Sequence, residues 1–392
     1  MPLRRLKISD PLAMQEPDHA TLLGGMSSSE FLQTHWQKQP KLIRQAWPGI
    51  TSPLSAEELA GLACEHQVDS RLITINDNTY QLVEGPLTED LFTGLPETHW
   101  SLLVTDLEKW LPDLCYLLSP FDFLPAWRID DLMISYATDS GGVGPHVDEY
   151  DVFLLQLSGR RQWQIGKKTD NKEFRSDCNL AVLQHFQQDQ SWVLEPGDML
   201  YLPPGVPHHG IALGNCLTAS IGFRAPLINT MVADYAGYLS EQTASRYQDS
   251  DLEPVEHSHQ LSAEALSRIK RQMLDLVAED EYFPQWAGEF LTNSNEIEAV
   301  KNPLDRSAFL KHLNQDAKLT KNNWSRLLYH HNDTNLTLFA DAVSYSIDST
   351  FLKQIQIICS CTEFALIDLS SNEEAVIDVL HQLYQQGSLI LE

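Results

Sequence analysis

The sequence predicts a mainly β domain that forms a small barrel, followed by a helical region and by a C-terminal part of mixed helices and strands. Short apolar or alternating runs, such as 132–136, 152–155 and 199–202, are separated by turns rich in Gly and Pro, as is typical of β-strands. After Pro226 the apolar residues recur at helical spacing. Beyond Asn302-Pro303, helix and strand patterns alternate.

Length, composition and charge limit the possible classes of protein. The chain has 392 residues, of which 43% are hydrophobic and 21% charged, so we expect a globular protein of two or three domains. Its net charge is −27, from 27 basic and 54 acidic residues. Such a charge repels nucleic acids and attracts basic partners. Keeping the protein soluble explains the acidity equally well.

The cysteines and the N-terminus indicate a cellular compartment. Six cysteines are scattered along the chain, and only Cys359 and Cys361 lie close together. This distribution predicts free thiols in a reducing compartment, because a zinc site or a disulfide framework needs further pairs. The N-terminal MPLRRLKISDPLAMQEP is followed by no continuous apolar segment, so we expect neither a secretory signal nor a membrane anchor. These features favour the cytoplasm.

A metal site is predicted by His146 and Asp148 together with His208. Residues i and i+2 of an extended strand point to the same side, so His146 and Asp148 can bind one ion from a single strand. His208 would come from a second strand, after the rigid turn at 203–205. Two imidazoles and one carboxylate form the facial triad of non-haem Fe(II) oxygenases. Polar residues at ordinary strand ends are the alternative interpretation.

The surrounding motifs resemble a known family. The stretch 127–135 (WRIDDLMIS), GPHVDEYDVF and PPGVPHHG are similar to the JmjC branch of the 2-oxoglutarate oxygenases, most closely to the bacterial ribosomal oxygenases. The resemblance is strongest over residues 30–226. It implies a double-stranded β-helix (cupin) jelly roll, a helical dimerisation region and a C-terminal winged-helix-like α+β domain.

The same resemblance implies a function. The expected cofactor is Fe(II), with 2-oxoglutarate and O2 as co-substrates. The expected reaction hydroxylates the β-carbon of an arginine in a basic protein of the large ribosomal subunit, and succinate and CO2 are the co-products. By the same resemblance, His146, Asp148 and His208 are both the metal ligands and the catalytic residues.

The strand after the H-x-D motif offers an anchor for 2-oxoglutarate. Beyond an expected turn at Gly159, Arg161 alternates with Trp163 on the apolar face. A buried cation needs an anion, and the distal carboxylate of 2-oxoglutarate would be that anion. The family has its anchor here, and Arg161 is the matching residue, although a register shift by one would select Arg160 instead.

Four other polar residues near the expected site are candidates for smaller roles. Thr218 and Ser220 alternate inward on the last barrel strand and could hydrogen-bond the co-substrate. Asp130 and Asp131 either face a cationic substrate side chain or cap a turn, and capping is slightly favoured.

Four parts are expected along the chain: an N-terminal extension (1–25), the JmjC/cupin domain (26–226), a helical region (227–302) and the winged-helix-like domain (303–392). Local patterns predict helices starting near Ser27 and Ser55 and a hairpin over 70–84. A helix over 262–278 carries an apolar stripe. That stripe packs either against the barrel or, as the resemblance implies, across a homodimer.

Three rival functions remain open. The triad does not separate arginine hydroxylation from histidyl hydroxylation or N-methyl-lysine demethylation, because the product depends on which carbon is presented. A zinc or manganese cupin isomerase would instead carry H-x-H and a Glu. The third is a non-catalytic cupin adaptor that acts through the winged-helix-like domain. That domain has no basic recognition helix, so we expect no direct DNA binding.

Overall fold

The computed structural model describes residues 16–391 apart from 170–171, 280, 295, 316, 333–334 and 370–372. Most of the predicted N-terminal extension therefore lies outside the described residues. The chain divides into two compact units, Met1–Ala225 and Pro226–Glu392. No helix among the described residues is long and apolar enough to cross a membrane. All six cysteines are free, as the sequence predicted.

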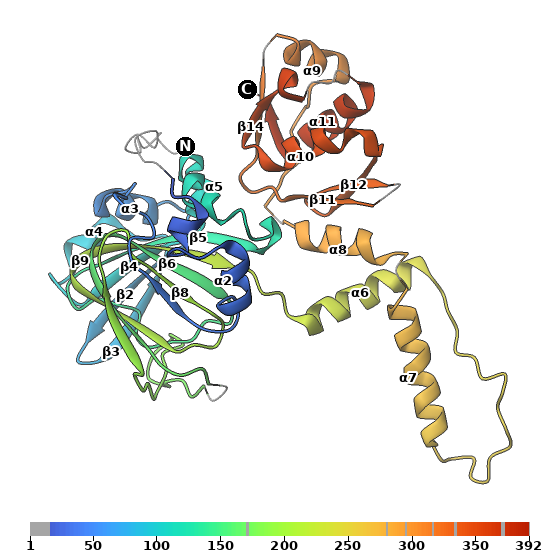
Figure 1. Cartoon of the computed structure of the whole chain (residues 1–392), viewed down its shortest axis with the longest axis horizontal. Helices are drawn as coiled ribbons and strands as arrows, with labels where there is room; N and C mark the ends of the chain where they lie inside the picture. Colours follow the sequence, from blue (N-terminus) through green and yellow to red (C-terminus); the bar gives the residue numbers. More distant parts are fainter. Residues whose placement is uncertain are drawn as a thin grey trace. The chain divides into compact units, whose positions relative to one another are not determined.

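The first unit is built on a nine-stranded antiparallel sheet that curls around its own core (Figure 1). Its strands, in the order in which they pair, are β1 (Lys41–Ile43), β8 (Met199–Leu202), β6 (Asp151–Ile165), β9 (His208–Phe223), β5 (Ile129–Ala137), β4 (Trp100–Val104), β2 (Ser70–Asn76) and β3 (Thr79–Glu84), with β7 (Gln190–Leu194) beside β6. The prediction of a mainly β domain is confirmed.

The two longest strands, β6 and β9, pair along nearly their full length. Their register runs from Asp151 opposite Phe223 to Ile165 opposite His208. The predicted turn at Gly159 is wrong, because β6 continues through this position with an irregularity in its register. Gly159 has a φ of +63°, and a Cβ there would lie 2.1 Å from the Asn215 carbonyl oxygen. The glycine therefore permits a bulge and a close approach to β9 rather than a chain reversal.

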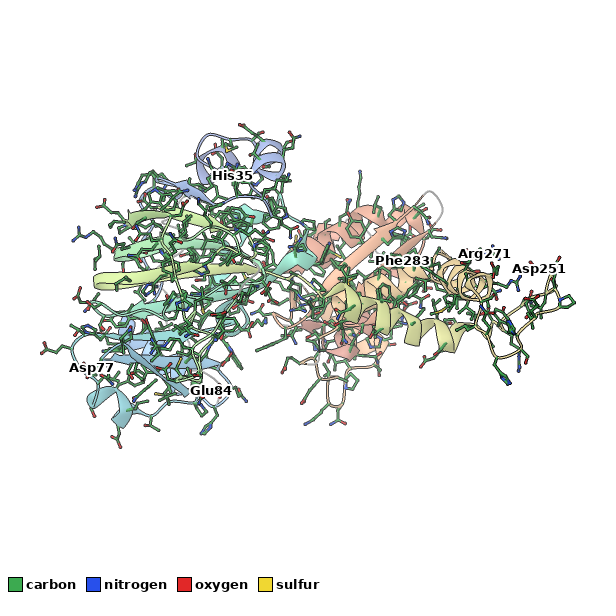
Figure 2. All side chains as sticks on the ribbon, turned by 90° about the horizontal axis from the view of Figure 1, so that it is seen from below. His35, Asp77, Glu84, Asp251, Arg271 and Phe283 are labelled. Atoms are coloured by element: carbon green, nitrogen blue, oxygen red, sulfur yellow. The ribbon has the colours of Figure 1, made fainter. Side chains whose placement is uncertain are left out.

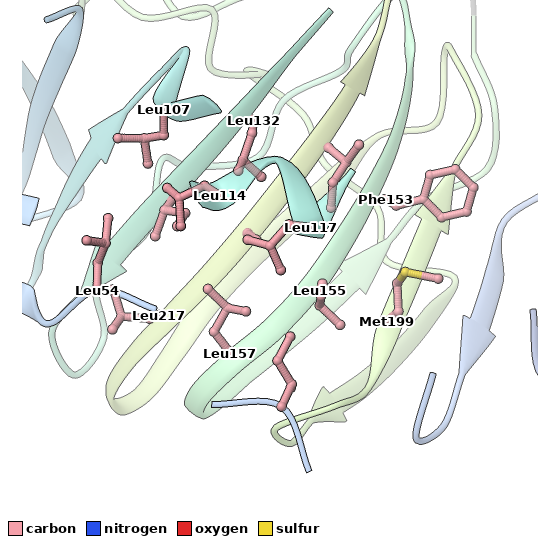
Figure 3. Packing of buried hydrophobic residues seen from close by; sticks show 14 of the residues in the cluster. Leu54, Leu107, Leu114, Leu117, Leu132, Phe153, Leu155, Leu157, Met199 and Leu217 are labelled. Carbon is pink, nitrogen blue, oxygen red and sulfur yellow. The ribbon is translucent and has the colours of Figure 1, made fainter. Parts of the chain in front are cut away.

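Short helices cover one face of this sheet. They are α1 (His19–Leu22), α2 (Ser28–Thr34), α3 (Ala56–Ala63), α4 (Glu89–Thr93), α5 (Leu107–Trp110) and the 3-10 helices η2 (Pro112–Leu117), η3 (Ser119–Phe121) and η4 (Ala126–Arg128). The predicted capping box at Ser55 is present, and Ser27 caps α2 as expected. Figure 3 shows leucines of α5 and η2, including Leu107 and Leu114, packed over β5, β6 and β9.

The predicted hairpin is also present. β2 and β3 pair from Asn76 opposite Thr79 to Arg71 opposite Glu84. Its two turn residues, Asp77 and Asn78, both have positive φ angles, which suits Asp and Asn in tight turns. Figure 2 labels Asp77 at the turn and Glu84 at the end of β3.

The second unit contains three helices and a winged-helix-like α+β part. Its elements are α6 (Ile228–Gln242), α7 (Ala263–Val277), α8 (Phe283–Thr292), α9 (Arg306–Leu313), β10 (Lys318–Lys321), β11 (Leu327–His331), β12 (Leu336–Ala340), β13 (Val343–Ile347), η5 (Ser349–Phe351), α10 (Leu352–Ser360), β14 (Glu363–Ala365), η6 (Leu366–Leu369), α11 (Glu374–Gln386) and β15 (Leu389–Leu391). The strands form two sheets, β14-β10-β15 and β11-β12-β13. The predicted helix over 262–278 is present as α7, capped by Ser262.

The α7 helix is only partly covered by the described part of its own unit, where Leu276 packs against the cluster of Tyr235, Leu239 and Trp286. It has no buried residue, and its stripe of large apolar side chains is exposed, with Leu266 52% and Met273 65% accessible. On its other side, Arg268 pairs with Asp251 at 2.9 Å. The side chains of Asp251 and of Arg271 on α7 are labelled in Figure 2.

Candidate active site

Two histidines are locked side by side at the start of β9. The His146 amide donates to the His208 carbonyl at 2.9 Å, and the His208 amide donates back to the His146 carbonyl at 2.9 Å. Their rings lie 4.1 Å apart between centroids. The prediction that His146 and Asp148 share a strand is wrong, because this segment is irregular and makes only this one bridge before β6 begins.

Asp148 nevertheless meets both histidines. Its carboxylate oxygens lie 3.9 Å from His146 Nε2 and 3.5 Å from His208 Nε2. The predicted turn at 203–205 helps to hold it, since the Gly205 amide donates to the Asp148 carbonyl at 2.9 Å. One ligand atom from each of the three residues lies within 4.8 Å of the others, which suits a single ion.

Backbone carbonyls set the tautomer of each histidine. His146 Nδ1 lies 3.0 Å from the Gly144 carbonyl, and His208 Nδ1 lies 3.0 Å from the Val206 carbonyl. A carbonyl can only accept, so each Nδ1 carries the proton and each Nε2 has a free lone pair for a metal. Burial lowers the pKa of His208 to about 4, and its imidazole is therefore neutral at neutral pH, as a ligand must be.

The three residues lie at a cavity of about 300 Å³. Asp131, Met133 and Ser135 of β5 line it in strict alternation. Leu180 and Val182 line it as well, and they come from the segment between β6 and β7.

Arg161 is a buried cation at this cavity. Its side chain is 3% exposed, whereas Arg160 is exposed to solvent. Its Nη1 donates to Ser135 Oγ at 3.1 Å and lies 3.4 Å from Thr218 Oγ1, while its Nε has no partner among the described residues. Burial lowers the pKa of Arg161, so the charged form lacks compensation here. An unpaired buried guanidinium of this kind suits an anionic ligand.

A glycine makes room for this guanidinium. A Cβ on Gly210 would lie 2.8 Å from Arg161 Nε and 2.8 Å from the Trp163 ring. The same ring lies under the guanidinium, 5.0 Å from its central carbon, and adds a cation–π contact.

The two polar residues predicted on the last barrel strand lie in different places, and neighbouring His209 lies outside the cavity. Ser220 lines the cavity directly. Thr218 is buried and contacts Arg161 and Gln156 instead. His209 does not line the cavity, and its ring lies edge-on to Phe186.

Asp131 is the residue to which sequence reasoning gave too little weight. The slight preference for a turn-capping role is wrong, because Asp130 and Asp131 both lie within β5. Asp131 lines the cavity, and burial raises its pKa to about 7, helped by the nearby charges of Asp130 and Asp106. The period-2 alternation with Met133 and Ser135 is the signal that could have indicated its orientation.

Comparison with known proteins identifies the family. The JmjC domain family matches residues 116–231, a ROXA-like winged helix matches 271–390 and an AraC-like ligand binding domain matches 181–285. The Escherichia coli ribosomal protein uL16 3-hydroxylase is 41% identical over 267 residues, which cover 68% of this chain and 71% of that protein. This chain belongs to the JmjC ribosomal oxygenases.

Other members of the family are similar over comparable lengths. A probable ribosomal oxygenase of Haemophilus influenzae is 36% identical, over 64% of this chain and 65% of that protein. A solved structure of the Escherichia coli ribosomal oxygenase YcfD, in complex with cobalt and 2-oxoglutarate, has a TM-score of 0.80 at 34% identity. The structural match covers 94% of this chain and 98% of YcfD. The predicted cupin and winged-helix-like folds are thereby confirmed.

We expect the ribosomal-oxygenase triad to bind one divalent ion per chain. Asp148→Ala should weaken binding of Mn(II) by about 100-fold or more, because even partners of metal ligands contribute about 10–100-fold. Isothermal titration calorimetry at neutral pH measures the affinity. His209→Ala is the matched control, since it removes a neighbouring imidazole that lies outside the cavity. Equal weakening by both variants would rule out this ligand set.

Proposed function

We propose that this chain is an Fe(II)- and 2-oxoglutarate-dependent hydroxylase of an arginine side chain in the ribosomal protein uL16. The observation that carries the proposal is a single cavity that combines three metal-type donors, a buried unpaired guanidinium and a carboxylate. The activity named for the Escherichia coli relative supports the choice of uL16.

The donor set fits Fe(II). His146, Asp148 and His208 would hold the ion through two imidazole nitrogens and one carboxylate oxygen, which is the donor set of non-haem Fe(II) oxygenases. With 2-oxoglutarate and O2, the bound iron supplies the oxidising power that converts a C–H bond to C–OH, and succinate and CO2 are released. The protein contributes orientation and the exclusion of water.

Arg161 would bind the distal carboxylate of 2-oxoglutarate. Its free Nε and its Nη groups offer the forked donor pattern that a carboxylate accepts. Ser135 and Thr218 hold Nη1 and so fix the direction of the fork. Ser220, on the same strand as Thr218, lines the cavity and can donate a further hydrogen bond.

Asp131 would bind the substrate cation. Asp131 is four residue steps from Ser135 along β5, and Ser135 contacts Arg161, so the Cα atoms of Asp131 and Ser135 lie about 13 Å apart at about 3.3 Å per residue. An anionic co-substrate at one end and a cationic side chain at the other can therefore be held without repelling each other. This arrangement favours an arginine or lysine side chain over a neutral one.

The decisive experiment is mass spectrometry of ribosomal proteins incubated with the protein, Fe(II) and 2-oxoglutarate. We expect one additional oxygen atom on a single arginine of uL16, and no change with His146→Ala. Consumption of 2-oxoglutarate with no oxygen added to any arginine would show that the protein is an oxygenase but would reject an arginine of uL16 as its target. Loss of a methyl group from lysine, or oxygen on histidine, would select the alternative outcomes. No turnover at all would favour the adaptor.

The raised pKa of Asp131 predicts a pH dependence. Cation binding needs the carboxylate, and a pKa of about 7 leaves most of the enzyme protonated at this residue below that pH. For an arginine peptide, kcat/KM should fall about tenfold from about pH 8 to about pH 6. The neighbouring charges are Asp130, Asp106, Lys109 and Arg71, of which the last two lower the pKa.

The control for this pH profile is Asp131→Asn. This variant should bind the arginine peptide weakly at every pH and lose the slope. Turnover of 2-oxoglutarate without peptide, recorded at each pH, corrects for titration elsewhere in the site. An unchanged slope in Asp131→Asn would contradict the assignment.

We also propose that the protein is a cytoplasmic homodimer that does not bind DNA directly. The exposed apolar stripe of α7 supports a second copy as its cover, because a stripe of this width is usually buried. Sedimentation equilibrium should give twice the mass of one chain. Met273→Glu should give a monomer, whereas Ser267→Glu, also exposed but beside the stripe, should remain dimeric. A monomeric wild type would reject the proposal.

A further inference from the structure

Strand β5 carries a bulge at Asp130 and Asp131. Ile129 pairs with Phe223 and Leu132 pairs with Ile221, so three residue steps on β5 face two on β9. The extra residue re-aims the side chains at this point. A Cβ on Gly222, opposite the bulge, would lie 2.6 Å from Asp131 Oδ1. The Asp131 carboxylate therefore lies directly over a glycine that lines the cavity.

The other edge of β5 ends its pairing just before the bulge. β4 pairs with β5 from Ala137 only as far as Ile134, after which the chain turns away into α5. The Leu132 amide is then bound by a side chain from α5, and it donates to Glu108 Oε2 at 2.9 Å. Glu108 thus occupies the position of the missing strand partner.

This acceptor is an unusual choice of residue. Glu108 is 8% exposed, and burial raises its pKa to about 7. A buried carboxyl group is costly unless it is hydrogen-bonded, and the Leu132 amide supplies a hydrogen bond here. The amide that the Glu108 carboxylate accepts belongs to Leu132, the residue that directly follows Asp131.

Two contacts fix the residue next to Asp131. The Leu132 side chain is fully buried in the core shared with Leu107 of α5, and both leucines are labelled in Figure 3. The Leu132 amide is held by Glu108. Because side chains alternate along a strand, fixing Leu132 toward the core directs Asp131 toward the cavity.

We propose that Glu108 is a positioning residue for the cationic substrate side chain, which it serves by holding the bulge that presents Asp131 to the cavity. This inference rests on the proposed arginine hydroxylase function. It adds a residue of α5, outside the sheet and the cavity, to the determinants of substrate recognition.

The test compares Glu108→Gln with Glu108→Met. Glutamine still accepts from the Leu132 amide and should keep the KM for an arginine peptide within about twofold of wild type. Methionine has a similar size but accepts poorly, and it should raise that KM about tenfold. The KM for 2-oxoglutarate and the turnover without peptide should not change. Thermal unfolding confirms that each variant is folded, and Glu108→Asp, with its shorter reach, replaces the methionine variant if that fails to fold.

A double-mutant cycle separates positioning from general stability. In an Asp131→Asn background, Glu108→Met should add little, because a neutral amide already replaces the carboxylate that Glu108 positions. The inference is overturned if Glu108→Met raises KM equally in both backgrounds, or raises the KM for 2-oxoglutarate as much as that for peptide. A wild-type protein that hydroxylates no arginine would instead reject the proposed function itself.

Discussion

The pairing of β6 with β9 is the interaction on which the site depends. It begins with Asp151 opposite Phe223 and ends with Ile165 opposite His208. His146 and Asp148 lie just before β6, Arg161 lies within it, and His208 opens β9. A shift of this register by one residue would turn Arg161 away from the cavity and move His208 away from Asp148. The glycine bulge at 159 lets two such long strands remain paired.

The cavity separates two opposite charges along one strand. Ser135, near one end of β5, accepts a hydrogen bond from Arg161, and Asp131 lies near the other end of the strand. Among the described residues no ion pair joins the two, so neither neutralises the other. The overall charge of −27 draws basic partners in general. Selection among them requires a carboxylate at a fixed place in the site, which is the role we assign to Asp131.

Three ionisable groups that are buried or partly buried lie in or beside the candidate site. Arg161 has an unpartnered Nε, and the carboxyl groups of Asp131 and Glu108 both have a pKa of about 7. Each costs folding free energy that an apolar residue would not. Such groups persist where they serve binding or orientation, and here all three lie on or beside strands that line the cavity.

The sequence by itself determined the metal-type triad, the burial of Arg161, the helix starts at Ser27 and Ser55, the helix over 262–278 and the hairpin over 70–84, because these follow from spacing, caps and period-2 alternation. Tertiary structure alone decided that His146 and Asp148 leave the strand, that Gly159 is a bulge and that Asp131 faces the cavity. It also created the bond between Glu108 and Leu132, which are 24 positions apart. A local pattern tells which face of the sheet a side chain points to only once the register of the strand is known. That register depends on bulges and on distant partner strands, which no short stretch of sequence contains.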